Sequence, residues 1–142
     1  MSNPKDLAIE ALELTDRQDW ARREALMTPD CEWSMPGAAL HGPEAATAYS
    51  KPFVGAFPDS KHTVDVIAGE GDVVAAEGTW VGTHLGPLPT PNGEIPATGQ
   101  TVRLPFGMIM RVRDGLIASM HVYYDQLGFL AQLGLVPEPQ AA

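Results

Sequence analysis

The chain of 142 residues has little cysteine and few basic residues. Its single cysteine, Cys31, cannot form an intramolecular disulfide, and it excludes a metal site built from several cysteines. There are 9 Lys and Arg against 18 Asp and Glu, which gives a formal net charge of -9. Because nucleic acids and anionic membranes attract basic surfaces, the charge balance predicts neither as a partner.

Other absences narrow the classes further. No apolar run approaches the about 18 residues that a membrane span needs, and the N-terminus lacks the apolar core of a secretion signal, so we expect a cytoplasmic protein. The patterns GxGxxG, GxxxxGK[ST], GxSxG and HExxH do not occur. The four histidines lack the local spacing of metal ligands. We therefore expect no cofactor and no metal.

The length and composition fit one domain. Hydrophobic residues make up 44% of the chain and charged residues 19%, which is typical of a globular protein. We expect residues 1–142 to form a single domain with an ordered core at about residues 4–136.

Three helices are predicted in the first part of the chain. Asn3 is a suitable N-cap before Pro4, and Trp20 to Met27 has the composition of a second, shorter helix. Pro43 opens a third, which contains Pro52. A short strand is predicted at Cys31 to Met35, and alternation predicts strands at His62 to Val66, Val73 to His84, Thr101 to Arg113 and Leu116 to Asp125. Prolines and glycines predict a long loop at Leu85 to Gln100, and leucines three residues apart predict a helix at Gln126 to Leu135.

This order of elements predicts an α+β fold. A curved antiparallel or mixed sheet would be covered on one face by the three N-terminal helices, enclosing a cone-shaped cavity.

The last strand carries the residues best suited to chemistry. Ser119, His121, Tyr123 and Asp125 share one face by alternation. If that face points inward, Asp125 lies in an apolar cavity, where a carboxylate serves as general base or acid. The alternative is that Asp125 is only the N-cap of the following helix, and that His121 and Tyr123 are core polar residues with satisfied hydrogen bonds.

The same orientation would leave apolar residues outside. Ala118, Met120, Val122 and Tyr124 would then cover the outer face of the sheet. An apolar outer face usually meets a partner, so we expect a homodimer formed through the sheet faces.

Further residues are expected to form the walls of a pocket for an apolar small molecule. We predict that they bind substrate together with Tyr123: Trp33, Met35, Tyr49, Phe53, Trp80, His84, Phe106 and Met108. For His84 the alternative is a hydrogen bond to the backbone of the long loop. His41 and His62 receive no role.

Several short stretches resemble the SnoaL-like polyketide cyclase (ester cyclase) family, part of the nuclear transport factor 2-like superfamily. The resemblance extends from about Leu7 to Leu135. It is carried by the order of Phe57-Pro58-Asp59, Trp80-Val81-Gly82-Thr83-His84, Ala97-Thr98-Gly99-Gln100, Arg111-Val112-Arg113-Asp114-Gly115, Tyr124-Asp125 and Gln132-Leu133-Gly134-Leu135.

The resemblance implies a dimeric, cone-shaped α+β barrel with a cavity and no cofactor. It also implies intramolecular aldol ring closure, with Asp125 at the position of the family's acid/base aspartate and His121 at a position that is His or Trp in many relatives. Met108 stands where relatives often have Asp or His.

We therefore expect a lyase or isomerase that needs no cofactor and transfers a proton on an apolar carbonyl substrate. Asp125 would abstract the proton, and His121 and Tyr123 would bind the enolate oxygen or orient Asp125. Two alternatives stay open. One is an isomerase or dehydratase on the same fold, and the other is a non-catalytic protein that binds a hydrophobic small molecule.

Overall fold

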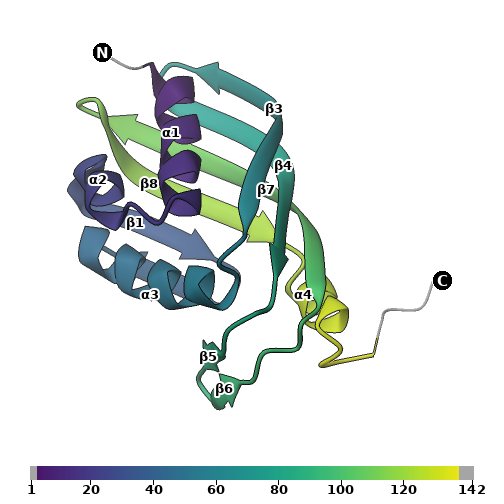
Figure 1. Ribbon diagram of the computed structural model, residues 1–142. Helices are drawn as coiled ribbons and strands as arrows, with labels where there is room; N and C mark the ends of the chain where they lie inside the picture. The colour runs from purple at the N-terminus through teal and green to yellow at the C-terminus, as the bar shows by residue number, and fades with distance from the viewer. Residues whose placement is uncertain (1–2, 138–142) are drawn as a thin grey trace.

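The computed structural model describes residues 3–137 as helices packed against one face of a curved sheet (Figure 1). The chain order is α1 (Pro4–Asp16), α2 (Trp20–Ala25), β1 (Met27–Met35), β2 (Ala38–His41), α3 (Pro43–Ala56), β3 (Lys61–Glu70), β4 (Val73–Thr83), β5 (Leu88–Thr90), β6 (Gly93–Ile95), β7 (Thr101–Arg113), β8 (Leu116–Tyr124) and α4 (Gln126–Gln132).

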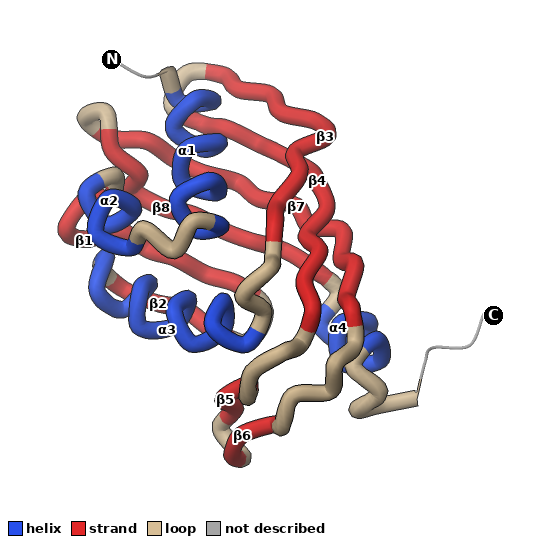
Figure 2. The backbone as a smooth tube through the Cα atoms, in the orientation of Figure 1, coloured by secondary structure: helices blue, strands red, loops and turns tan. Residues whose placement is uncertain are grey.

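The main sheet is mixed, with strand order β2-β1-β8-β7-β4-β3. Strand β1 runs parallel to β8, whereas the other neighbours are antiparallel. Helices α1, α2 and α3 lie on the same side of the sheet, and α4 sits beyond the end of β8 (Figure 2). The predicted α+β arrangement with three N-terminal helices is confirmed.

Local signals place the helix ends. The side chain of Asn3 accepts a hydrogen bond from the Asp6 amide at 2.9 Å, as expected of an N-cap, and Pro4 follows at the first helical position. Helix α3 begins at Pro43 and continues through Pro52 to Ala56.

Three short strands, β2, β5 and β6, were not predicted. Strand β1 starts at Met27 instead of Cys31, and it forms a hairpin with β2. The stretch from Thr28 to Cys31 interrupts the pairing of β1 with β8, and Pro29, which cannot donate a ladder hydrogen bond, lies within it. The predicted loop from Leu85 to Gln100 contains the small hairpin of β5 and β6, which extends below the main sheet in Figure 1.

A β-bulge interrupts the pairing of β3 with β4. Val64 pairs with Gly78 and Val66 pairs with Glu77, so Asp65 is an extra residue in the ladder. At this point the backbone of β3 approaches β4 so closely that a side chain at Gly78 would overlap the carbonyl oxygen of Thr63. Before the bulge, His62 and Val64 face inward. The extra residue shifts the alternation, so Val66 beyond it is exposed.

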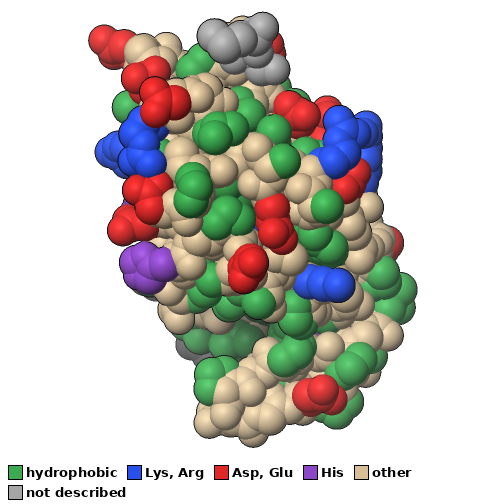
Figure 3. Space-filling view, turned by 90° about the vertical axis from the view of Figure 1, so that its left-hand side faces the viewer, with side chains coloured by type: hydrophobic (Ala, Val, Ile, Leu, Met, Phe, Trp, Pro, Cys, Tyr) green, Lys and Arg blue, Asp and Glu red, His purple; other side chains and the backbone are tan. Residues whose placement is uncertain are grey.

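The outer surface mixes hydrophobic, acidic and basic side chains on the face shown in Figure 3. Arg103, Arg111 and Arg113 are exposed on β7. Three of the four residues predicted to cover the outer face are instead turned inward, since Met120 is fully buried and Val122 and Tyr124 line a cavity. The homodimer therefore stays a prediction, and an apolar outer face on β8 no longer supports it.

Candidate active site

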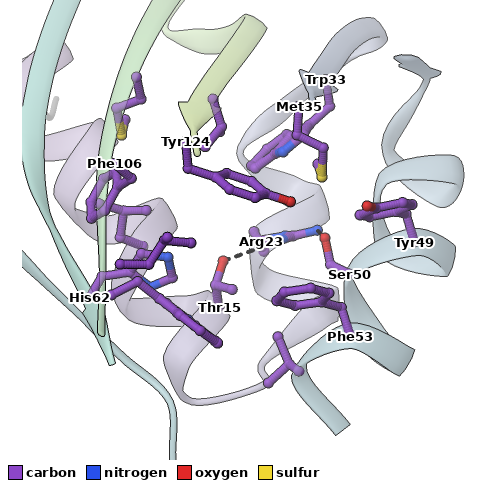
Figure 4. A pocket seen from close by; sticks show the side chains of 16 residues that line it. Thr15, Arg23, Trp33, Met35, Tyr49, Ser50, Phe53, His62, Phe106 and Tyr124 are labelled. Atoms are coloured by element: carbon purple, nitrogen blue, oxygen red, sulfur yellow. Dashed lines mark hydrogen bonds between the residues drawn. The ribbon is translucent and has the colours of Figure 1, made fainter. Parts of the chain in front are cut away.

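A cavity of about 120 Å³ lies between the helical layer and the sheet (Figure 4). Most of its wall is apolar or aromatic. Seven of the predicted wall residues line it: Trp33, Met35, Tyr49, Phe53, Trp80, Phe106 and Met108. The sheet supplies five of these from β1, β4 and β7, and α3 supplies Tyr49 and Phe53.

The prediction that Asp125, His121 and Tyr123 face this cavity is wrong. Asp125 is exposed, and the Tyr123 side chain is on the outer face with 57% of its surface exposed. His121 makes a 2.7 Å hydrogen bond through Nδ1 to the hydroxyl of Ser34. Their neighbours Val122 and Tyr124 line the cavity instead.

A bulge at Ala118 explains the inversion. A two-residue turn at Asp114-Gly115 without irregularity would pair Met108 with His121 and place both on one face. In the structure, Val112 pairs with Ile117 but Arg111 pairs with Ser119, so Ala118 is inserted. Met108 consequently pairs with Val122. A shift of one residue turns every later side chain to the other face of the sheet.

Asp125 has the alternative role that the sequence left open. It is the N-cap of α4, and its Oδ1 accepts a hydrogen bond from the Gly128 amide at 2.9 Å. A cap of this kind stabilises a helix end by about 1 kcal/mol.

Substitutions of Asp125 should therefore affect stability and leave cavity chemistry unchanged. We expect Asp125→Asn to keep wild-type stability, because asparagine also caps helices. We expect Asp125→Ala to lower the free energy of unfolding by about 1 kcal/mol, measured by urea denaturation. A loss of binding in the cavity for Asp125→Asn, at unchanged stability, would contradict the assignment.

His84 is also outside the cavity wall. Its ring is fully buried and stacks on Phe57 at 5.1 Å between ring centroids. Its Nδ1 accepts a hydrogen bond from the Thr98 amide at 3.2 Å, and its own amide donates to the Gln100 carbonyl at 2.9 Å. His84 thus fixes the end of the long loop to β4, which is the alternative stated for it, and its predicted place in the pocket is wrong.

His62, to which the sequence assigned no role, lies in the cavity wall and is paired with Asp16. Its Nδ1 is 2.6 Å from Oδ1 of Asp16, and its backbone amide donates to Oδ2 of the same carboxylate at 3.0 Å. Because a carboxylate oxygen only accepts, Nδ1 donates the proton, and in the neutral ring Nε2 carries the lone pair. The Phe106 ring meets the imidazole edge-on at 5.3 Å.

Asp16 occupies a position where a carboxylate does not stabilise its own helix. Asp16 is the last residue of α1, where the helix dipole disfavours a negative charge. The carboxylate nevertheless points at the start of β3, and both side chains are largely buried, with 18% exposed for His62 and 19% for Asp16. An acidic residue at the end of a predicted helix was therefore the sequence signal that could have identified Asp16 as part of the site.

Two tyrosine hydroxyls belong to the same wall. Burial raises the pKa of Tyr124 to about 12, with a smaller contribution from Tyr49. Burial also raises the pKa of Tyr49 above its ordinary value. Both phenols therefore stay protonated at neutral pH and can donate hydrogen bonds to a ligand oxygen.

Arg23 of α2 completes the polar part of the wall, and the sequence analysis missed it. Only 1% of its surface is exposed. Nη1 donates to the hydroxyl of Thr15 at 3.0 Å, and Nη2 donates to the hydroxyl of Ser50 at 3.0 Å and to the carbonyl of Ala46 at 3.3 Å. Figure 4 shows Thr15 between His62 and Arg23.

The described residues offer neither a metal cluster nor a spanning helix. Within residues 3–137, no three His, Cys, Asp or Glu side chains are grouped so that they could hold a metal ion. Of the helices in that range, none has the length and apolar character needed to cross a bilayer.

Comparison with known proteins identifies a family. The family model described as the SnoaL-like domain matches residues 8–120. A proposed polyketide cyclase from Xanthomonas campestris pathovar campestris is 25% identical, with a TM-score of 0.80 over 92% of this chain and 96% of that one. IdmH, a proposed polyketide cyclase from Streptomyces antibioticus, is 27% identical, with a TM-score of 0.78 over 94% of this chain and 99% of that one.

The fold extends to more distant proteins. A Catenulispora acidiphila protein with a ketosteroid isomerase-like fold is 20% identical, with a TM-score of 0.75 over 92% of this chain and 93% of that one. These likenesses confirm the predicted fold. No protein with a curated description matches the sequence.

Proposed function

Because the chain belongs to the SnoaL-like family, we propose that it is an enzyme that transfers a proton at a carbon next to a carbonyl group. The observation that carries this proposal is the pairing of His62 with Asp16 on the wall of an apolar cavity. A carboxylate that holds Nδ1–H orients the ring and leaves Nε2 as a general base. The role first considered for Asp125 passes to His62.

The remaining polar groups suit the second requirement of this chemistry. When a proton leaves the carbon, negative charge builds up on the carbonyl oxygen, and hydrogen-bond donors aimed at that oxygen lower the barrier. Tyr124 and Tyr49 are protonated donors in the cavity wall. In a dry site such donors act more strongly than in water.

The preferred reaction is ring closure by aldol addition. Nε2 of His62 takes the proton from the carbon next to one carbonyl, and Tyr124 donates a hydrogen bond to the enolate oxygen. The enolate carbon then bonds to a second carbonyl carbon of the same molecule, whose oxygen becomes an alkoxide and receives the proton back from the imidazolium. The solved relatives described as proposed polyketide cyclases support this choice over isomerisation.

The cavity limits the size of the reacting group. Its volume is about 120 Å³, and an engineered cavity of about 150 Å³ binds benzene. The enclosed space therefore suits one six-membered ring. A larger substrate would extend past Met35 and Tyr49, which are only half-buried.

Hydrogen exchange tests the proposal without knowledge of the natural substrate. Cyclohexanone fits the enclosed volume, and its protons next to the carbonyl exchange with D₂O when a base removes them. We expect the protein to accelerate this exchange above that of buffer and of an equal concentration of unfolded protein, measured by proton NMR. Cyclohexanone that binds but exchanges no faster would favour the alternative of a non-catalytic binding protein.

A further inference from the structure

All the groups that contact the Arg23 guanidinium directly are uncharged. Its carbon lies 4.9 Å from the centroid of the Trp20 ring and 4.6 Å from that of the Trp33 ring. Its three hydrogen bonds go to two hydroxyls and one carbonyl oxygen, and Nε has no partner among the described residues. No carboxylate within the described part of the chain forms an ion pair with it.

This leaves a positive charge inside the protein without a directly paired carboxylate among the described residues. Burial lowers the pKa of Arg23 to about 10, and the nearby Glu24 opposes this only in part. The group is therefore still protonated at neutral pH. Removing a cation from water is strongly unfavourable unless an opposite charge accompanies it. Neutral partners and aromatic rings compensate for only part of that loss.

We propose that the cavity binds a ligand bearing a carboxylate, which pairs with Arg23. Arginine carries five N–H donors, and the described hydrogen bonds occupy three of them. The other two are Nε–H, which is buried and has no partner among the described residues, and one N–H of Nη1. Most of the wall away from Arg23, His62 and the two tyrosines is apolar, so the ligand is a small apolar ring or chain with one carboxylate.

This inference rests on the proposed function in that it names the substrate class of the same cavity. The substrate would carry both an enolisable carbonyl near His62 and a carboxylate near Arg23. A charged anchor on one side of the cavity fixes which carbon meets the base, since a purely apolar wall leaves a small ring free to turn.

A matched pair of ligands tests the proposal by binding alone. Benzoate and benzamide have nearly the same shape, but only benzoate is charged. We expect the wild-type protein to bind benzoate about ten- to hundred-fold more tightly than benzamide, measured by calorimetry or by quenching of tryptophan fluorescence. Equal affinities, or no benzoate binding, would overturn the proposal.

Two variants assign the preference to one side chain. Arg23→Met keeps the length of the side chain but removes its charge, and we expect it to bind both ligands equally. Because methionine leaves the buried Ser50 hydroxyl and Ala46 carbonyl without this donor, the melting temperature should fall, and binding is compared at a temperature where both proteins are folded. His62→Gln should retain the preference for benzoate. A preference that persists in Arg23→Met, or that disappears in His62→Gln, would contradict the assignment to Arg23.

The two proposals can fail separately. A preference for benzoate without accelerated exchange of cyclohexanone would keep the carboxylate site and reject the enzyme. Accelerated exchange without a preference for benzoate would keep the enzyme and reject the carboxylate.

Discussion

Replacing His62 by glutamine is expected to slow the protein-catalysed exchange of cyclohexanone protons by about 10²- to 10⁴-fold, the usual contribution of a general base. Glutamine has nearly the size of histidine and can still donate to Asp16, but it cannot take a proton. The affinity for the ketone should change little, because the cavity wall is otherwise intact. The measurement is the exchange rate as a function of ketone concentration, which separates kcat from KM.

Two further variants show whether the loss of exchange is specific to the pair of His62 and Asp16. In Asp16→Asn the amide oxygen can still accept the hydrogen bond from Nδ1–H of His62, but the side chain carries no charge. This variant should therefore lower kcat less than His62→Gln and leave KM near that of the wild type. His121→Gln changes the histidine on the outer face of the sheet, bonded to Ser34, and should have the wild-type rate. Unchanged exchange in His62→Gln would remove the basis of the proposed mechanism.

Replacing Gly78 by alanine is expected to lower the free energy of unfolding by about 2–3 kcal/mol. The added methyl group would overlap the Thr63 carbonyl oxygen and approach the Phe106 ring at 3.1 Å. Neither neighbour can yield easily, because one is backbone at the bulge and the other is a ring packed in the cavity wall. Urea denaturation followed by tryptophan fluorescence measures the loss.

Gly107 offers a matched control on the adjacent strand. A methyl group there meets only the Ala76 carbonyl oxygen, at 3.9 Å. Because alanine is better than glycine within a strand, Gly107→Ala should leave stability unchanged or raise it by up to about 1 kcal/mol. If both variants have the same free energy of unfolding, the close approach of β3 to β4 does not make glycine necessary at position 78.

The sequence predicted elements whose signals are local. Asn3 and Pro4 set the start of α1, Pro43 set the start of α3, and the alternation from Thr101 to Arg113 matched β7. The apolar wall of the cavity also followed from this alternation on β4 and β7.

The polar part of the site could not be predicted in this way. One inserted residue, Ala118, exchanged the two faces of β8, and nothing in the local pattern of alternating residues marks it. Asp16 and His62 are 46 residues apart, so their pairing depends on how α1 packs on β3. Arg23 was missed because arginine is rarely buried, and its burial here depends on contacts with α1 and α3.

The last turn of α1 has a mechanical consequence. Thr15 and Asp16 are consecutive residues, and they hold Arg23 and His62 respectively. A small rotation of this turn would move both attachments at once. If a ligand at the guanidinium shifted this turn, it would also move the imidazole, and the effect would be reciprocal. A substrate that docks its anionic end would in this way help to set the base that acts on its other end.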